Sequence, residues 1–370
     1  MKQILINNIK NIHGRRTKEK IVIIECDDWG GIRMPSKVVL DSLISEGLNI
    51  GQGRYNRYDT LENYYDLQKL FEILTTVRDS ENKHCVMTAI TNVANPNFRK
   101  IKEGNFKVYY NEKFIDTLNN YYPDEDVFGS WKEGIDAGIF IPELHGREHL
   151  SVQSWMKRLR EGNKDLHIAF DKGFVALSLP DQLPLEKEFR AEFFFRSEDE
   201  KPFLIKSIND SIVYFQEIFG RLPRVFVPSN QVFHPEFETI IANSGVKYLY
   251  VSHSMPIPIE GGGIKYRHFM NWHKSNSGIV YYTRNCAFEP TDKGYKGIET
   301  TLKQIAASFR WGNPANISTH RVNFAGGIDP SNREKGLIEL KKLLQAIVLM
   351  WPDVKFMSSG DAFDSLGEKP

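Results

Sequence analysis

Short hydrophobic runs alternate along the chain with longer segments whose apolar residues recur every three or four positions. The short runs have the length and composition of buried strands. Eight of them can be recognised, at residues 21–26, 85–93, 138–144, 225–228, 248–252, 279–283, 317–319 and 355–357. Alternating strands and helices are typical of parallel βα units. The pattern therefore predicts an α/β fold, a distorted (β/α)7–8 TIM-like barrel.

The clearest helix of this pattern begins near Ser331 and ends near Trp351-Pro352. Ser331 and Glu334 have the spacing of a capping box. An apolar stripe follows at Leu337, Leu340, Leu344, Ile347 and Val348. This segment is expected to pack one face against the sheet.

Two segments do not fit the alternation and are interpreted as long insertions. Residues 47–65 are rich in Gly, Asn, Arg and Tyr, and residues 181–202 are charged and aromatic with three prolines. Loops that follow strand ends build the active site of a barrel, so both insertions are expected to shape a substrate site. We therefore expect one barrel domain over residues 1–370, with its core at about 21–357.

Composition is compatible with this picture. The 370 residues are 41% hydrophobic and 26% charged, which is ordinary for a globular chain, and the formal net charge is +1. This balance gives no reason to expect a nucleic-acid partner. Cys26, Cys85 and Cys286 have wide spacings and are expected to be buried free thiols. No signal peptide or membrane span is recognised, which predicts a cytoplasmic protein.

Candidate chemistry starts where the first strand ends, at Asp27 and Asp28. Two adjacent carboxylates at a buried strand end are costly unless a cation faces them. A metal ion meets this need if one carboxylate binds it while the other, pointing the opposite way, stays free as a base. An acidic turn in solvent would explain the pair equally simply.

A second signal follows the run at 138–144, where His145 and His149 are four residues apart. From one helical turn, two such imidazoles can bind one ion. Together with Asp28 they form the three-ligand set of a catalytic zinc site, which leaves a position for water. His320 ends a further strand, where a barrel would place it in the same opening as a candidate acid or base.

These residues resemble the motifs of the polysaccharide deacetylase family, the NodB-homology carbohydrate esterases related to carbohydrate esterase family 4. Residues 25–30 (Glu-Cys-Asp-Asp-Trp-Gly) are similar to the family's T-F-D-D-G motif, and residues 145–149 to its H-[ST]-x-x-H motif. Residues 318–320 are similar to its L-x-H motif, and residues 226–230 to its R-P-P-[YF] motif. Such a resemblance implies a distorted barrel with one divalent metal.

The resemblance also implies roles for single residues. Asp27 would be the catalytic base, His320 the general acid, and Asp28, His145 and His149 the metal ligands. Trp29 and Asn230 would bind substrate. The metal would be Zn²⁺, with Co, Ni, Mn or Fe as alternatives.

Three positions depart from the family pattern: Trp29 is inserted, Gly146 replaces Ser or Thr, and Val227 replaces the arginine that orients the base. Arg284 or Arg147 could take the place of that arginine from another strand end.

The function predicted from these residues is metal-dependent removal of an acetyl group from an N-acetylated sugar or glycan. The sequence does not identify the sugar or the oligomeric state. Residues 145–149 also spell H-x-x-E-H, so a zinc metallopeptidase with Glu148 as its base is one alternative. A catalytically inactive glycan-binding barrel is another, suggested by Val227.

Overall fold

The protein is described here by a computed structural model of residues 2–50 and 53–367. Its centre is a nine-stranded parallel sheet with the order β10-β7-β6-β5-β2-β1-β12-β11, in which β13 also pairs with β1. The strands are β1 (Lys20–Trp29), β2 (Met87–Asn92), β5 (Phe140–Gly146), β6 (Val225–Phe226), β7 (Tyr248–Tyr250), β10 (Val280–Tyr282), β11 (Cys286–Ala287), β12 (Ala315–His320) and β13 (Val354–Phe356). All eight predicted strands are present in this sheet, and its ninth strand, β11, is the one the sequence did not reveal.

The curled sheet is a distorted barrel because one short segment joins its two edges. Strand β10 pairs with β7 at one edge, and β11 pairs with β12 at the other. Only residues 283–285 separate β10 from β11 along the chain. The predicted TIM-like α/β fold is therefore confirmed, and residue 284 is held where the two edges approach each other.

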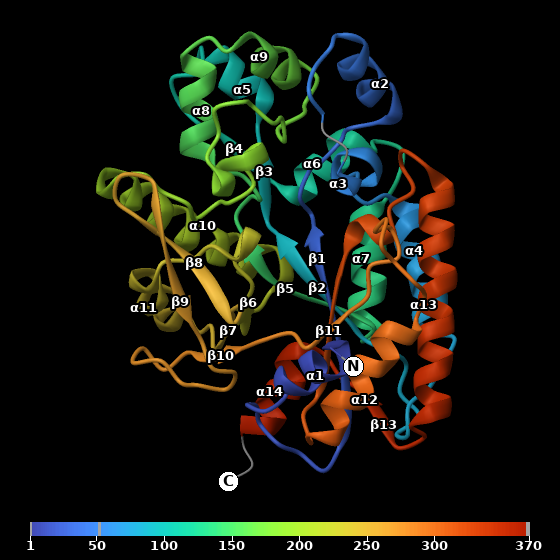
Figure 1. Cartoon of the computed structure of the whole chain (residues 1–370). Helices are drawn as coiled ribbons and strands as arrows, with labels where there is room; N and C mark the ends of the chain where they lie inside the picture. Colours follow the sequence, from blue (N-terminus) through green and yellow to red (C-terminus); the bar gives the residue numbers. More distant parts are fainter. Residues whose placement is uncertain (1, 51–52, 368–370) are drawn as a thin grey trace.

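Helices cover the outside of the sheet (Figure 1). Those around the barrel are α4 (Tyr64–Leu74), α6 (Phe114–Tyr121), α7 (Val127–Asp136), α10 (Lys201–Phe219), α11 (Glu238–Asn243), α12 (Glu299–Arg310) and α13 (Pro330–Met350). Helix α14 (Ser359–Gly367) packs instead against the opposite face of the strands, with Ile21 and Ile23 of β1. Apolar residues of β1, β2 and β12 pack with α4, α7 and α13 in the largest hydrophobic cluster. Helix α13 matches the predicted helix, but its cap is Asp329, which accepts from the backbone N–H of Ser331; the Ser331 capping box is wrong.

A second layer, here called the cap, lies beyond the carboxyl end of β1 (Figure 1, top). It contains α2 (Lys37–Ser45), α5 (Phe98–Glu103), α8 (Val152–Arg160) and α9 (Lys164–Asp171), whose apolar residues form their own cluster. Shorter elements are α1 (Lys2–Ile9), α3 (Arg54–Tyr58) and the hairpins β3 (Ala94–Pro96) with β4 (Asn111–Lys113) and β8 (Ser254–Ile259) with β9 (Gly263–His268).

Two further expectations can be compared with the structure. All three cysteines are buried and free, as predicted. Among the helices of residues 2–50 and 53–367, none is both long enough and apolar enough to span a bilayer.

Candidate functional site

A bulge at the end of β1 turns two adjacent carboxylates into one cavity. Neighbouring strand residues normally point to opposite faces, and the sequence prediction for Asp27 and Asp28 assumed this. The pairing of β1 with β2 shifts between Cys26 and Trp29, however, and Asp28 has a φ of 78°. Both side chains therefore line the same cavity, of about 530 Å³. A non-glycine residue in this conformation is strained, and such strain often accompanies function.

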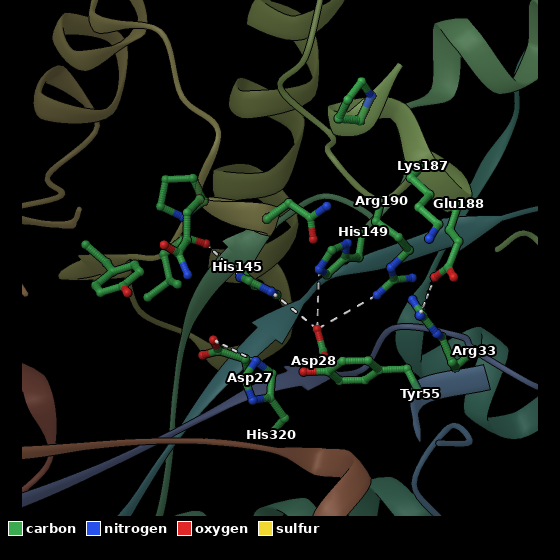
Figure 2. Close-up of a pocket in the computed structure, with 16 residues that line it drawn as sticks. Asp27, Asp28, Arg33, Tyr55, His145, His149, Lys187, Glu188, Arg190 and His320 are labelled. Carbon is green, nitrogen blue, oxygen red and sulfur yellow. Dashed lines mark hydrogen bonds and ion pairs between the residues drawn. The ribbon is translucent and has the colours of Figure 1, made fainter. Parts of the chain in front are cut away.

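The two predicted histidine ligands approach the same oxygen of Asp28 (Figure 2). Nε2 of His145 is 3.5 Å and Nε2 of His149 is 3.4 Å from Asp28 Oδ1. Nδ1 of His145 lies 2.7 Å from the carbonyl oxygen of Val227, so this nitrogen donates and Nε2 is the ring atom available to a metal ion beside Asp28.

The histidines do not share a helical turn, contrary to the prediction. His145 is the penultimate residue of β5, and His149 lies in the loop before α8. The chain turns between them at Gly146, whose φ is 128° and where a β-carbon would collide with Oε2 of Glu192. The serine or threonine of the family motif would therefore not fit here, which explains the glycine.

The donor set of Asp28, His145 and His149 fits one divalent ion. Among the described residues, these three side chains are the group of His, Cys, Asp or Glu that could hold a metal ion. Their candidate ligand atoms lie within 4.8 Å of one another. Ligands at zinc bond lengths in a tetrahedron are about 3.3 Å apart, close to the separations found here. Burial alone would raise the pKa of Asp28, but the imidazoles hold it well below its usual range. Burial, with the charge of Arg190, also lowers the pKa of His149. Carboxylate and neutral imidazole are the forms that bind metal.

Arg284 binds Asp27 with both ends of its guanidinium. Its Nη1 and Nη2 lie 2.6 and 2.7 Å from the two Asp27 oxygens, and Nε lies 2.5 Å from Glu25 Oε2. It comes from the segment that joins the two sheet edges, so of the two arginines considered in place of the one missing at Val227, Arg284 contacts Asp27. Arg147 does not, because it pairs with Glu148 and Asp210 instead.

His320 is held by Glu289, whose Oε1 lies 2.6 Å from Nδ1 of the imidazole. The other ring nitrogen, Nε2, lies 3.8 Å from Asp27 Oδ2. Burial lowers the pKa of His320, but the carboxylate of Glu289 outweighs it and raises the value to about 9. The sequence does not identify this partner of His320, because Glu289 follows the two-residue strand β11, which leaves no recognisable hydrophobic run.

The two predicted substrate residues differ in their outcome. Asn230 lines the cavity. Trp29 does not: it is fully buried, and its ring packs edge-on against Trp131 and Phe140. The bulge that brings Asp28 into the cavity sends the next side chain into the core, so stacking of Trp29 on a sugar is contradicted.

Much of the remaining wall of the cavity comes from the two insertions, whose lining residues were not predicted one by one. The two insertions contribute Tyr55, Lys187, Glu188 and Arg190, and Arg33 follows β1. Nη2 of Arg190 lies 3.9 Å from Asp28 Oδ1 (Figure 2). Burial and the charge of Arg33 lower the pKa of Arg190 to about 9. Both insertions thus border the cavity.

The geometry does not support the peptidase reading of residues 145–149. Glu148 is buried and accepts two hydrogen bonds from Arg147, and it does not line the cavity. Its motif lies on a strand end and a loop, whereas the peptidase motif lies on a helix.

Comparisons with known proteins give similarity to carbohydrate-active enzymes. Residues 195–290 match the model of glycosyl hydrolase family 57. No curated protein matches the chain. Because the matched family is a different one, the polysaccharide deacetylase resemblance stays a prediction.

One similar solved structure is a 4-alpha-glucanotransferase from Thermococcus litoralis, with 10% identity and a TM-score of 0.46. The match covers 94% of this chain but only 40% of the glucanotransferase chain. A GH57-type branching enzyme from Pyrococcus horikoshii has 10% identity and a TM-score of 0.44, and the match covers 94% of this chain and 70% of the branching enzyme. A peptidoglycan deacetylase from Bacillus subtilis has 9% identity and a TM-score of 0.39, and the match covers 95% of this chain and 92% of the deacetylase. With TM-scores below 0.5, these likenesses carry no functional argument, so function must be argued from the site.

Proposed function

We propose that the chain is a metal-dependent hydrolase that removes an acetyl group from an N-acetylated sugar or glycan. One observation carries this proposal: three candidate ligands meet at one point, with a carboxylate and an imidazole directly beside them. When bound, a divalent ion such as Zn²⁺ would supply Lewis acidity that polarises a carbonyl and eases proton loss from water. Asp28, His145 and His149 would hold it.

Asp27 is proposed to take the proton of the attacking water. Its two oxygens are held by Arg284, so the carboxylate keeps one orientation toward the cavity. A base needs this positioning because proton transfer requires hydrogen-bond distance to the water. Glu25, also bound to Arg284, stays fully buried and acts only as support.

His320 is proposed to give a proton to the departing amine nitrogen. Its Nδ1 is bonded to Glu289, so Nε2 is the atom that can deliver the proton into the cavity. The carboxylate of Glu289 keeps the imidazole protonated at neutral pH, as the raised pKa indicates. Base and acid thus lie side by side, separated by 3.8 Å.

Cleavage of a glycosidic bond is the second candidate, because residues 195–290 match a glycosyl hydrolase family. That chemistry needs two carboxyl groups, of which one stays protonated as the acid. In the described structure, the carboxyl groups lining the cavity are Asp27, Asp28 and Glu188. Each faces an arginine or the two imidazoles. The site therefore favours acyl transfer to water over glycoside cleavage.

The two candidates differ in their products. Purified zinc-loaded protein should release acetate and free amine from acetylated chito-oligosaccharides, whereas glycoside cleavage would release reducing ends without free amine. Asp27→Asn should abolish acetate release with zinc retained, and Glu148→Gln should keep it. New reducing ends without acetate, or loss of activity only in Glu148→Gln, would overturn the proposal. Binding of chito-oligosaccharides without any product would instead favour an inactive glycan-binding barrel.

A further inference from the structure

One wall of the cavity carries more positive charge than the proposed chemistry uses. Arg33, Lys187 and Arg190 line this wall. Lys187 and Arg190 belong to the insertion at 181–202, in which Phe189 packs with the cap helices and Phe193 with residues of the sheet.

Arg190 is the central member of this wall. Its side chain is only 8% exposed, and within the described ranges its guanidinium makes no hydrogen bond; its one ion-pair contact is the 3.9 Å approach to Asp28. Its donors border the cavity and have no protein acceptor within hydrogen-bond distance, so an anionic group in the cavity could accept from them. At 3.9 Å this approach is too long for a hydrogen bond, and Asp28 lies closer to His145 and His149.

The neighbouring charges do not satisfy Arg190 either. Arg33 gives one hydrogen bond to Glu188 at 3.1 Å, and its buried Nε has no partner in the described structure. Lys187 is exposed at the rim, and its ammonium group makes no hydrogen bond or ion pair with any described residue. After Glu188 has paired with Arg33, and Asp27 with Arg284, two cations still face the cavity without a carboxylate of their own.

We propose that Arg190, with Lys187 and Arg33, forms a subsite for an anionic group of the substrate, a phosphate or a carboxylate. That the anion is carried by an acetylated sugar rests on the proposed function, and the subsite adds that this sugar bears a negative charge. Arginine is suited to either group because its donors match two oxygens at once. Since Arg190 lies next to a candidate metal ligand, the charged substituent belongs on the sugar that carries the acetyl group, or on its direct neighbour.

Calorimetry tests the subsite without relying on turnover. The Asp27→Asn variant, as purified, would be titrated with inorganic phosphate, N-acetylglucosamine, its 6-phosphate and N-acetylmuramic acid. We expect at least one anionic sugar to bind about tenfold or more tightly than the neutral sugar, as a charge-assisted hydrogen bond provides. Stronger binding of the phosphate or of the carboxylate compound identifies the anion.

Variants assign the effect to this wall. Adding Arg190→Gln should remove the preference for the anionic sugar, and adding Lys187→Gln at the exposed rim should reduce it without any risk to folding. Arg99→Gln is the matched control, because Arg99 is exposed on α5 and does not line the cavity. If phosphate and both anionic sugars bind no better than the neutral sugar, or if Arg190→Gln and Lys187→Gln keep the preference, the subsite is refuted.

Activity separates the subsite from the proposed function. If the wild-type protein deacetylates neutral and anionic sugars equally well, the function stands and the subsite fails. If the anionic sugar binds through Arg190 but no acetate is released, the subsite stands and the function fails. Equal loss of turnover on neutral and anionic sugars in Arg190→Gln would show that this residue serves the reaction itself, which overturns the subsite.

Discussion

The cavity has two halves of different origin. One half comes from the carboxyl ends of β1, β5 and β12, which bring Asp27, Asp28, His145 and His320 together. The other half comes from the insertions, which provide Tyr55, Lys187 and Arg190. The strand half contains the groups proposed to perform hydrolysis, and the loop half contains the charges proposed to recognise the ligand.

This division follows from how each half is held. Strand ends are tied into the sheet by backbone hydrogen bonds, so a catalytic set placed there keeps its distances. Loops can change in length and charge without disturbing the barrel. We therefore expect changes in the strand half to affect kcat most, and changes in the loop half to affect substrate binding.

The largest effect is expected for Asp27→Asn. Removal of the base should lower kcat about 10²- to 10⁴-fold, because asparagine cannot accept the proton. Zinc content should not change, since Asp27 is not one of the three candidate ligands. Kinetics together with metal analysis would check this, and a variant that loses zinc in step with activity would place Asp27 among the ligands.

A loss of similar or somewhat smaller size is expected for His320→Ala, which removes the acid. In the wild type, kcat should fall as the pH rises through the pKa of His320, because only the imidazolium can donate. That pKa is about 9 without metal, and a bound dication would repel the imidazolium and move the limb below 9. The variant should lose this alkaline limb. An acetyl ester with a good leaving group should partly restore its rate, and absence of rescue in a folded, zinc-containing variant would contradict the role.

Arg284→Met tests the support of the base. It leaves Glu25 and Asp27 near each other without their shared cation, and breaking a buried pair costs about 3–5 kcal/mol of stability. Denaturant unfolding should show this loss, and kcat should fall in the fraction that remains folded. Unchanged stability would mean that Arg284 does not hold these carboxylates.

A moderate effect is expected for Glu289→Gln. The amide cannot stabilise the imidazolium as the carboxylate does, so the pKa of His320 should fall and the alkaline limb should move to lower pH. At a pH well below the new limb, the loss in kcat should be small. A pH–rate profile is the measurement, and a limb that stays in place would show that Glu289 does not set the titration.

The smallest effect is expected in the loop half, for Tyr55→Phe. The hydroxyl accepts a hydrogen bond from Arg54 at 2.9 Å and lines the cavity. Loss of one such bond should change KM by about tenfold or less and leave kcat nearly unchanged. A fall in kcat comparable to that of His320→Ala would break the division between the two halves.

The strand half is also the half that the sequence predicts well. Hydrophobic runs locate the strands, and the polar residues directly after them are expected to meet at one edge. The bulge at Asp28 is not visible in the pattern, so the directions of Asp27 and Trp29 were predicted wrongly. Strand β11 is too short to leave a hydrophobic run, and Glu289 was missed with it.

The loop half could be predicted only as a region. Residues 181–202 show no periodicity, so nothing in the pattern says which of their charged side chains turn inward. Arg190 and Lys187 are three residues apart in such a segment, yet one is buried and the other exposed. Arg284 was predicted in part, because the sequence offered both Arg284 and Arg147 as the arginine that contacts Asp27. Only the closure of the barrel, which brings Arg284 to Asp27, distinguishes the two.

The central claim is that Asp28, His145 and His149 hold one divalent ion. Crystals of the purified protein, measured on both sides of the zinc absorption edge, test it most directly. We predict a single anomalous peak about 2.0–2.2 Å from Asp28 Oδ1 and from both Nε2 atoms, absent in crystals of His149→Ala. No peak at this position in zinc-soaked wild-type crystals, or an unchanged peak in His149→Ala, would contradict the account.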